Sequence, residues 1–118
     1  MTLDHVRNHC LKKKFVTEEF PFDEETLVFK VMGKMFLLTN INPPLSINLK
    51  CDPETAIELR ERYSAVTPGY HMNKKHWNTI DINGTIAPKL LFQWIDESYS
   101  LVVRSLPKAK RDKIGNSS

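Results

Sequence analysis

Residues 27–50 read LVFKVMGKMFLLTNINPPLSINLK, and they predict the centre of the fold. The runs 27–31 and 35–39 are rich in β-forming residues, and Met32-Gly33-Lys34 separates them, which is typical of a β-hairpin. Residues 45–50 then alternate strictly between apolar and polar side chains, so this strand should turn one face to the core and the other to water. The stretch therefore predicts three antiparallel strands with one solvated face.

A helix is predicted on each side of these strands. The first helix should begin after Thr2 and end near the lysine run at 12–14, because its apolar residues follow i, i+3, i+7 spacing (Leu3, Val6 and Cys10). The second should open with Asp52 as its N-cap and Pro53 in its first turn, and should continue to Tyr63. Its apolar face (Ala56, Leu59 and Tyr63) is expected to lie on the sheet.

The C-terminal part predicts one more strand and one long helix. Residues 78–82 alternate again before Asn83-Gly84, so Trp77 should start a fourth strand. The last helix should begin at Pro88 and end near Pro107, with one buried stripe: Leu91, Ile95, Ser98 and Val102, widened by Trp94 and Leu101. The order α-β-β-β-α-β-α predicts an α+β domain, with helices on one face of an antiparallel sheet of about four strands.

Composition places the chain among ordinary globular proteins. With 118 residues, 41% of them apolar and 26% charged, one domain with a real core is expected over residues 1–106. Residues 107–118 should form a flexible basic tail. No apolar run reaches the roughly 20 residues of a membrane helix, and the N-terminus lacks the pattern of a secretory signal, so a cytoplasmic location is expected. The two cysteines, Cys10 and Cys51, are expected to be buried free thiols.

Charge is distributed unevenly along the chain. The net charge is +3, and the tail accounts for it, with four Lys or Arg against one Asp, while residues 1–106 carry 13 basic and 13 acidic side chains. An acidic patch precedes the hairpin: Glu18, Glu19, Asp23, Glu24 and Glu25. A polarised surface is therefore expected, and the sequence pI of 8.9 falls just below the range typical of nucleic-acid-binding domains.

Residues 67–77, TPGYHMNKKHW, are the chemically densest stretch. Pro68-Gly69 predicts a turn, after which Asn73 can cap a short helical turn that begins with Lys74, Lys75 and His76. Cations are unfavourable at the start of a helical turn, because the exposed N–H groups already concentrate positive charge there. This conflict favours an anion resting on the turn.

The motifs together resemble the MmcQ/YjbR-like family of small bacterial proteins over about residues 10–106. The matching motifs are Phe20-Pro21-Phe22, Phe29-Lys30-Val31-x-Gly33-Lys34-Met35-Phe36, Leu49-Lys50-Cys51-x-Pro53, Leu59-Arg60, Pro68-Gly69-x-His71-x-Asn73-Lys74-x-His76-Trp77 and Ser98-Tyr99. One departure is Lys13-Lys14-Phe15, where many members have a Pro-Gly turn. The resemblance implies an α+β domain whose hairpins project like two wings, a shape for which DNA binding has been proposed.

The favoured function is weak, salt-sensitive binding to the phosphate backbone of double-stranded DNA. The expected contact residues combine the dense stretch with lysines that flank the hairpin and with two further cations: His71, Asn73, Lys74, Lys75, His76, Lys30, Lys34, Lys50 and Arg60. A monomer is favoured, and no catalytic activity, cofactor or metal is expected.

Three alternatives remain open from the sequence. The dense stretch could be a structural clasp, in which His71, Asn73 and His76 satisfy backbone groups around a turn. The acidic patch and the hairpin surface could instead bind a protein. An enzyme using His71 or His76 as a general base is less favoured, because no clear nucleophile or pair of carboxylates accompanies them. A metal at His5 and His9, or a reactive thiol at Cys51, is less favoured still.

Overall fold

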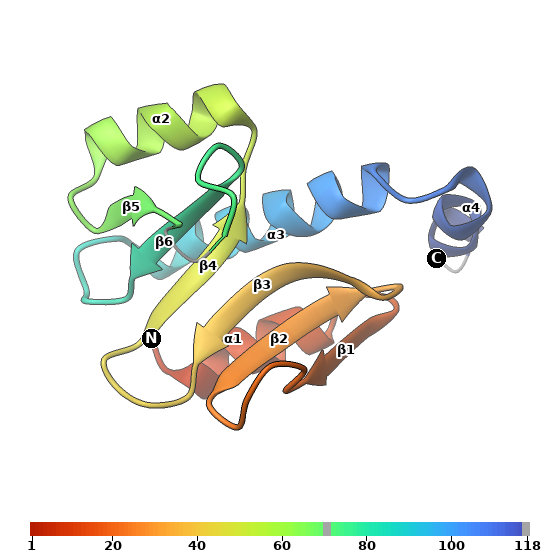
Figure 1. Cartoon of the computed structure of the whole chain (residues 1–118), viewed down its shortest axis with the longest axis horizontal. Coiled ribbons are helices and arrows are strands. Elements are labelled where there is room, and N and C mark those ends of the chain that lie inside the picture. Colours follow the sequence, from red (N-terminus) through yellow and green to blue (C-terminus); the bar gives the residue numbers. More distant parts are fainter. Residues whose placement is uncertain (70–71, 117–118) are drawn as a thin grey trace.

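In the part of the chain that the structure describes, six strands form one antiparallel sheet in the order β1-β2-β3-β4-β6-β5 (Figure 1). The computed structural model describes residues 1–69 and 72–116. The strands are β1 (Val16–Glu19), β2 (Thr26–Val31), β3 (Lys34–Asn40), β4 (Ser46–Lys50), β5 (Val66–Pro68) and β6 (Trp77–Asp81). The helices are α1 (Leu3–Leu11), α2 (Pro53–Arg62), α3 (Pro88–Arg104) and α4 (Lys108–Asn116). The predicted α+β class is confirmed, with six strands in place of about four.

The hairpin predicted at Met32-Gly33 is present and joins β2 to β3. Val31 pairs with Lys34, and both intervening residues have positive φ, 50° at Met32 and 87° at Gly33. Two positive φ values in a two-residue loop are typical of a type I′ turn, whose twist matches that of the flanking strands. The turn therefore fixes the register that brings Lys30 and Lys34 to one end of the sheet.

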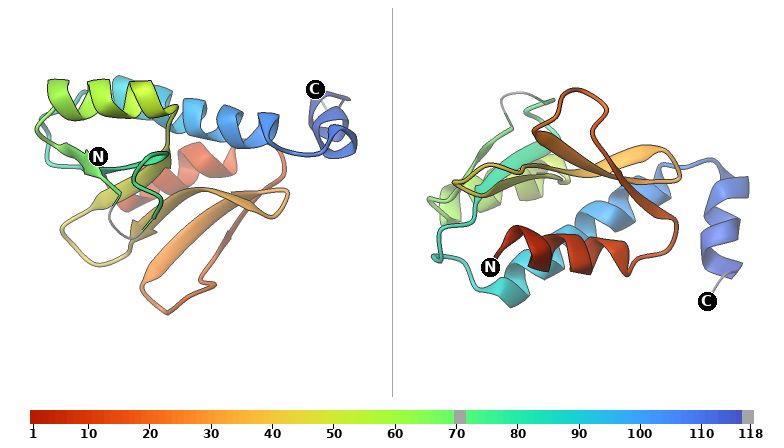
Figure 2. Two further views of the ribbon diagram at one scale, coloured as in Figure 1. Left: turned by 45° about the horizontal axis from the view of Figure 1, so that its top comes forward. Right: turned by 90° about the horizontal axis from the view of Figure 1, so that it is seen from below.

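Helices α1, α2 and α3 lie on one face of the sheet, and the other face is open (Figure 2). The core between them contains the inward-facing residues of every strand from β2 to β6 together with the buried stripes of α1 and α3. Leu91, Trp94, Ile95, Ser98 and Val102 form the α3 stripe, as predicted. A smaller apolar cluster lies on the open face, where Val28, Leu38 and Trp77 are buried and Met35 and Met72 pack against them.

The predicted helix starts are confirmed. Thr2 caps α1 and forms a capping box with His5, and Asp52 caps α2 by accepting hydrogen bonds from the backbone N–H groups of Glu54 and Thr55. After α1 ends at Leu11, the chain reverses through Phe15, which has φ 60°. This reversal replaces the Pro-Gly turn that many members of the resembled family carry.

Three elements were not predicted: β1, β5 and α4. The two strands are short edge strands of four and three residues, and they contain acidic residues and a proline that disfavour strand assignment. Residues 108–116 form a helix where an unstructured tail was expected, and Ile114 of this helix packs against the main core. No helix within residues 1–69 and 72–116 is long and apolar enough to cross a membrane.

Candidate functional site

The strand register brings most of the predicted contact residues to one end of the sheet. Val31 pairs with Lys34 at the β2–β3 turn, and Lys50 pairs with Trp77 where β4 ends and β6 begins. Because neighbouring strands are antiparallel, the end of β4, the β2–β3 turn and the segment before β6 all lie at this end. The sequence signal for the convergence was the position of each lysine at a predicted strand end.

At this end β3 and β4 separate, and α3 fills the space behind them. Their last pair is Leu37 with Leu49, and Figure 1 shows the two strands diverging beyond it with α3 passing behind. The Ser98 hydroxyl bridges the separation, since it donates to the carbonyl of Phe36 on β3 at 2.6 Å and accepts from the backbone N–H of Lys50 on β4 at 2.9 Å. Ser98 therefore satisfies two backbone groups that no longer pair with each other.

The space between the separated strands forms an open cavity of about 440 Å³, which we call the fork. Its described lining residues come from β2, the β2–β3 turn, β3, β4 and the end of α3: Lys30, Gly33, Lys34, Met35, Lys50, Val102 and Ser105. Three of the nine predicted contact residues thus share one cavity.

The three fork lysines differ in their surroundings. Lys30 is ion-paired with Glu19 on β1, so its charge is largely offset. Lys34 is exposed and Lys50 is half-buried, and neither forms an ion pair with another residue of the described ranges. Lys34 and Lys50 are therefore the cations of the fork that are available to an anion.

Helix α4 adds basic residues beside the fork. It begins three residues after Ser105, which lines the fork, and it carries four basic side chains against one carboxylate: Lys108, Lys110, Arg111 and Lys113 against Asp112. Figure 1 shows α4 standing beyond the C-terminal end of α3, on the same side of the molecule as the β2–β3 turn. Within the predicted basic tail, residues 108–116 thus form a helix that extends the same positive region.

Arg60 holds α2 against the segment before β6. Its Nε donates to Asn78 Oδ1 at 2.6 Å, and its Nη2 donates to the carbonyls of Lys74 and Trp77. Asn78 is fully buried and donates from Nδ2 to the Ala56 carbonyl at 3.2 Å. We call Arg60, Asn78 and the turn at 73–77 the clasp. Arg60 was expected to extend a basic contact surface, whereas its guanidinium is directed into the protein.

Asn73 also acts within the clasp. Its carbonyl accepts hydrogen bonds from the N–H groups of His76 and Trp77, and its Oδ1 accepts from the N–H of Lys75 at 2.9 Å. The predicted cap of a short helical turn is therefore confirmed. Because the cap itself occupies the Lys75 N–H, that donor is not available to an external anion, and the clasp alternative is favoured for Asn73.

Gly69 is required by the close approach of the two strands that meet at the clasp. Its N–H donates to the Trp77 carbonyl at 2.9 Å, and a Cβ at this position would lie 3.0 Å from the Trp77 Cβ and 3.1 Å from its carbonyl oxygen. The predicted turn at Pro68-Gly69 thus coincides with a position where only glycine fits without a shift of backbone.

The remaining predicted residues of the dense stretch differ in their exposure to solvent. Lys74 and Lys75 are exposed, and His76 is half-buried with its carbonyl accepting from the Cys51 N–H at 2.7 Å. His71 lies outside the described residues. Lys74 and Lys75 therefore add positive charge at the same end of the sheet as the fork, on the far side of β4.

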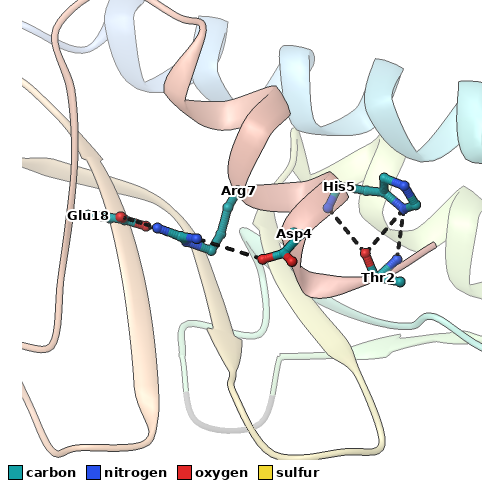
Figure 3. A network of polar contacts seen from close by, with 5 residues as sticks. All are labelled: Thr2, Asp4, His5, Arg7 and Glu18. Carbon is teal, nitrogen blue, oxygen red and sulfur yellow. Dashed lines mark hydrogen bonds and ion pairs between the residues drawn. The ribbon is translucent and has the colours of Figure 1, made fainter.

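Most carboxylates of the acidic patch have hydrogen-bond or ion-pair partners within the protein. Arg7 on α1 forms a two-point hydrogen bond with Glu18, at 2.9 and 2.6 Å, and lies 3.7 Å from Asp4 (Figure 3). The hydrogen bond from Arg7 holds the pKa of Glu18 below its usual value. Asp23 accepts from the backbone N–H groups of Thr26 and Glu25, which lowers its pKa as well. Three of the five carboxylates thus have partners inside the chain, with Glu19 paired to Lys30.

The two histidines named as less favoured candidates have structural partners, and the thiol of Cys51 is partly buried. His5 Nδ1 accepts from the Thr2 N–H in the capping box (Figure 3), and His9 Nε2 lies 2.7 Å from Asp96 Oδ1 with its ring stacked on Phe92. Burial raises the pKa of the Cys51 thiol to about 11. At neutral pH this thiol is protonated, which makes it a weak nucleophile.

A second cavity lies on the open face of the sheet, next to the fork. It measures about 400 Å³ and its described lining residues are uncharged: Thr26, Leu38, Thr39, Asn40, Ser46, Asn48, Thr67, Met72 and Thr79. We call it the open-face pocket. Thr79 donates from Oγ1 to Asn48 Oδ1 at 2.5 Å across the β4–β6 pair, which fixes the orientation of the Asn48 amide. None of these residues is among the nine contact residues predicted from the sequence.

Comparison with known proteins supports the resemblance seen in the motifs. The model of the YjbR family matches residues 11–101. The chain is 41% identical over 105 residues to the uncharacterised protein YbdF of Escherichia coli O157:H7, covering 88% of this chain and 84% of that protein. It is 30% identical over 112 residues to the uncharacterised protein YjbR of Escherichia coli K12, covering 94% and 95% of the two chains.

A solved structure is similar over nearly the whole chain. The crystal structure of Deinococcus radiodurans protein DR2400, described as a DUF419 domain, superposes with a TM-score of 0.90 at 44% identity and covers 97% of this chain and 88% of that one. The names of these relatives give no substrate or partner. The function must therefore be argued from the residues at the fork and the clasp.

Proposed function

The chain belongs to the YjbR family. We propose that it is a non-catalytic protein that binds the phosphate backbone of nucleic acid at the fork. Double-stranded DNA is the proposed ligand. The observation that carries the proposal is the convergence of Lys34 and Lys50 on one cavity while neither has an ion-pair partner among the described residues. Two unpaired ammonium groups in one cavity repel each other, and a phosphate between them relieves that repulsion.

The surroundings of the fork extend this positive region. Helix α4 supplies exposed cations on one side, and Lys75 supplies another beyond β4. In this proposal the strands on the two sides of the fork act as the two wings that the family resemblance implies. Contacts of this kind position a protein on nucleic acid without reading its sequence, so binding should be weak and strongly dependent on salt.

A binding function fits the chemistry of the fork better than catalysis does. Its described lining residues include no carboxylate, histidine or thiol that could serve as a general base or an activated nucleophile. The protein-binding alternative is weaker because Glu18, Glu19 and Asp23 of the acidic patch are already bound within the chain. Phosphate binding therefore remains the function that the geometry supports best.

The experiment is fluorescence anisotropy with a labelled duplex of about 20 base pairs, at about 50 mM and about 200 mM salt. The double variant Lys34→Gln/Lys50→Gln should bind about tenfold more weakly at the lower salt, and the slope of log Kd against log salt should fall by about 2, because each neutralised phosphate contributes about 0.9. The matched control is Arg62→Gln/Lys89→Gln, which removes two exposed cations remote from the fork and should leave both quantities unchanged.

Two results would count against the proposal. The first is an absence of wild-type binding even at the lower salt. The second is a fall in melting temperature of the lysine variant with unchanged binding, because this would show that the lysines serve the C-terminal end of α3, where cations complement the helix dipole.

A further inference from the structure

The open-face pocket and the fork adjoin along the strands of the sheet. Asn48 lines the pocket and Lys50 lines the fork, and these two residues lie on the same face of β4, two positions apart, which corresponds to about 7 Å. On β3, Leu38 and Met35 make the same connection, since both belong to the apolar cluster of the open face. A single ligand lying along β4 would therefore reach both cavities.

The two cavities differ sharply in charge. The fork contains lysines, whereas the described lining of the open-face pocket contains hydroxyl, amide and apolar side chains and no ionisable group. The pocket size of about 400 Å³ falls within the roughly 300–1,000 Å³ that is typical of small-ligand sites. A ligand that matches both cavities must have an uncharged polar part joined to an anionic part.

The pocket side chains suit a flat heterocycle in particular. Leu38 and Met72 offer apolar contacts to the face of a ring, and a thioether interacts favourably with aromatic rings. The Asn48 Oδ1 accepts a hydrogen bond from Thr79 Oγ1, and no residue of the described ranges accepts one from the Asn48 Nδ2. An asparagine side chain whose Nδ2 is free to donate commonly forms hydrogen bonds with the polar edge of a nucleobase.

We infer that the open-face pocket holds one unpaired nucleobase while the phosphate of the same nucleotide or of its neighbour lies at the fork. This inference rests on the proposed phosphate binding and deepens it, because it names the preferred substrate as nucleic acid with an unpaired base. A paired base cannot enter, since its polar edge and both ring faces are occupied within the duplex. Among duplexes, those with a bulged nucleotide are therefore the preferred ligands.

The test compares three labelled duplexes of about 20 base pairs: one fully paired, one with a single bulged adenosine, and one whose bulged nucleotide lacks its base. The bulged duplex should bind about tenfold more tightly than the paired one, because one stacked and hydrogen-bonded base contributes this much or more. The baseless bulge should bind like the paired duplex. Equal binding of all three would overturn the inference and leave the phosphate proposal standing.

Variants of the pocket sharpen the comparison. Asn48→Ala should reduce the preference for the bulged duplex to about one while binding to the paired duplex stays the same, and Ser100→Ala, an exposed serine on α3, is the control that should change neither. If Asn48→Ala proves unstable, Met72→Ala is the second variant, because Met72 also lines the open-face pocket and its loss should reduce the preference in the same way. A full preference that persists in both folded variants would overturn the inference.

A separate measurement keeps the two proposals distinguishable. Adenosine carries no phosphate, so its titration into 15N-labelled protein tests the open-face pocket alone. Chemical-shift changes are expected at the amides of Leu38, Asn48 and Thr79, and changes confined to other residues would overturn the inference. If the wild type binds none of the three duplexes at low salt, the phosphate proposal fails, and the preference for an unpaired base in nucleic acid fails with it.

Discussion

The clasp and the fork lie at the same end of the sheet and both contain cationic and polar side chains, but they differ in whether those side chains have partners within the protein. In the clasp, Arg60, Asn73 and Asn78 donate to or accept from groups of the protein itself. At the fork, the ammonium groups of Lys34 and Lys50 form no ion pair with the described residues. The difference teaches that polar density in a sequence does not show which polar groups are bound within the protein, whereas the hydrogen bonds of the structure do.

The largest effect is expected from the clasp. Asn78→Ala removes the buried acceptor of Arg60 Nε and the donor to the Ala56 carbonyl, and it leaves a cavity beneath α2. Unsatisfied buried groups and a cavity together should reduce the free energy of unfolding by about 3 kcal/mol, measured by urea denaturation. Lys75→Ala is the control in the same turn, and it should change stability by less than about 0.5 kcal/mol because the side chain is exposed. Similar losses in the two variants would show that the clasp is not a buried network.

The next largest effect on stability is expected from Ser98, which lies where β3 and β4 separate. Ser98→Ala removes the hydroxyl that joins the Phe36 carbonyl to the Lys50 N–H, so two backbone groups lose their partner. We expect the free energy of unfolding to fall by about 2 kcal/mol, and the amide protons of Lys50 and its neighbours on β4 to exchange faster with deuterium. Ser100→Ala removes an exposed hydroxyl from the same helix and should leave both measurements unchanged. Unaltered exchange at Lys50 in the Ser98 variant would mean that the strands are held apart by other contacts.

Much of the fold follows from local chemistry that the sequence displays. The type I′ turn at Met32-Gly33, the capped start of α2 at Asp52 and the strand after Trp77 each depend on residues within a few positions of one another. Strands β1 and β5 escaped prediction because they are short, lie at the sheet edges and gain their conformation from pairing with β2 and β6. Helix α4 escaped prediction because its one apolar anchor, Ile114, lies among basic and polar residues.

The candidate site was only partly predictable. Lys30, Lys34 and Lys50 each stand at a predicted strand end, so antiparallel order alone brings them to one end of the sheet. The Ser98 hydroxyl bridges the separated strands β3 and β4. Ser98 is 62 residues from Phe36 along the chain, and no local pattern encodes that contact. The one available signal was a serine within the apolar stripe of α3, because a polar residue at a buried position must have a partner. The role of Arg60 could not be predicted either, because its hydrogen-bond partners lie 14 to 18 residues away along the chain.

The smallest effect concerns Cys51, whose N–H joins the end of β4 to the clasp. Burial raises the pKa of its thiol to about 11, so the reactive thiolate is scarce at pH 7 and its population rises about tenfold with each pH unit below that value. Alkylation by iodoacetamide, followed by mass spectrometry, should therefore be slow at pH 7 and should accelerate steadily up to pH 10, much later than for a free cysteine with its pKa near 8.5. Cys10, whose pKa is raised to about 12 by deeper burial, should react more slowly still and provides the internal comparison. Rapid labelling of Cys51 at pH 7 would show a stabilised thiolate at the start of α2 and would turn the clasp from a structural contact into a candidate reactive site.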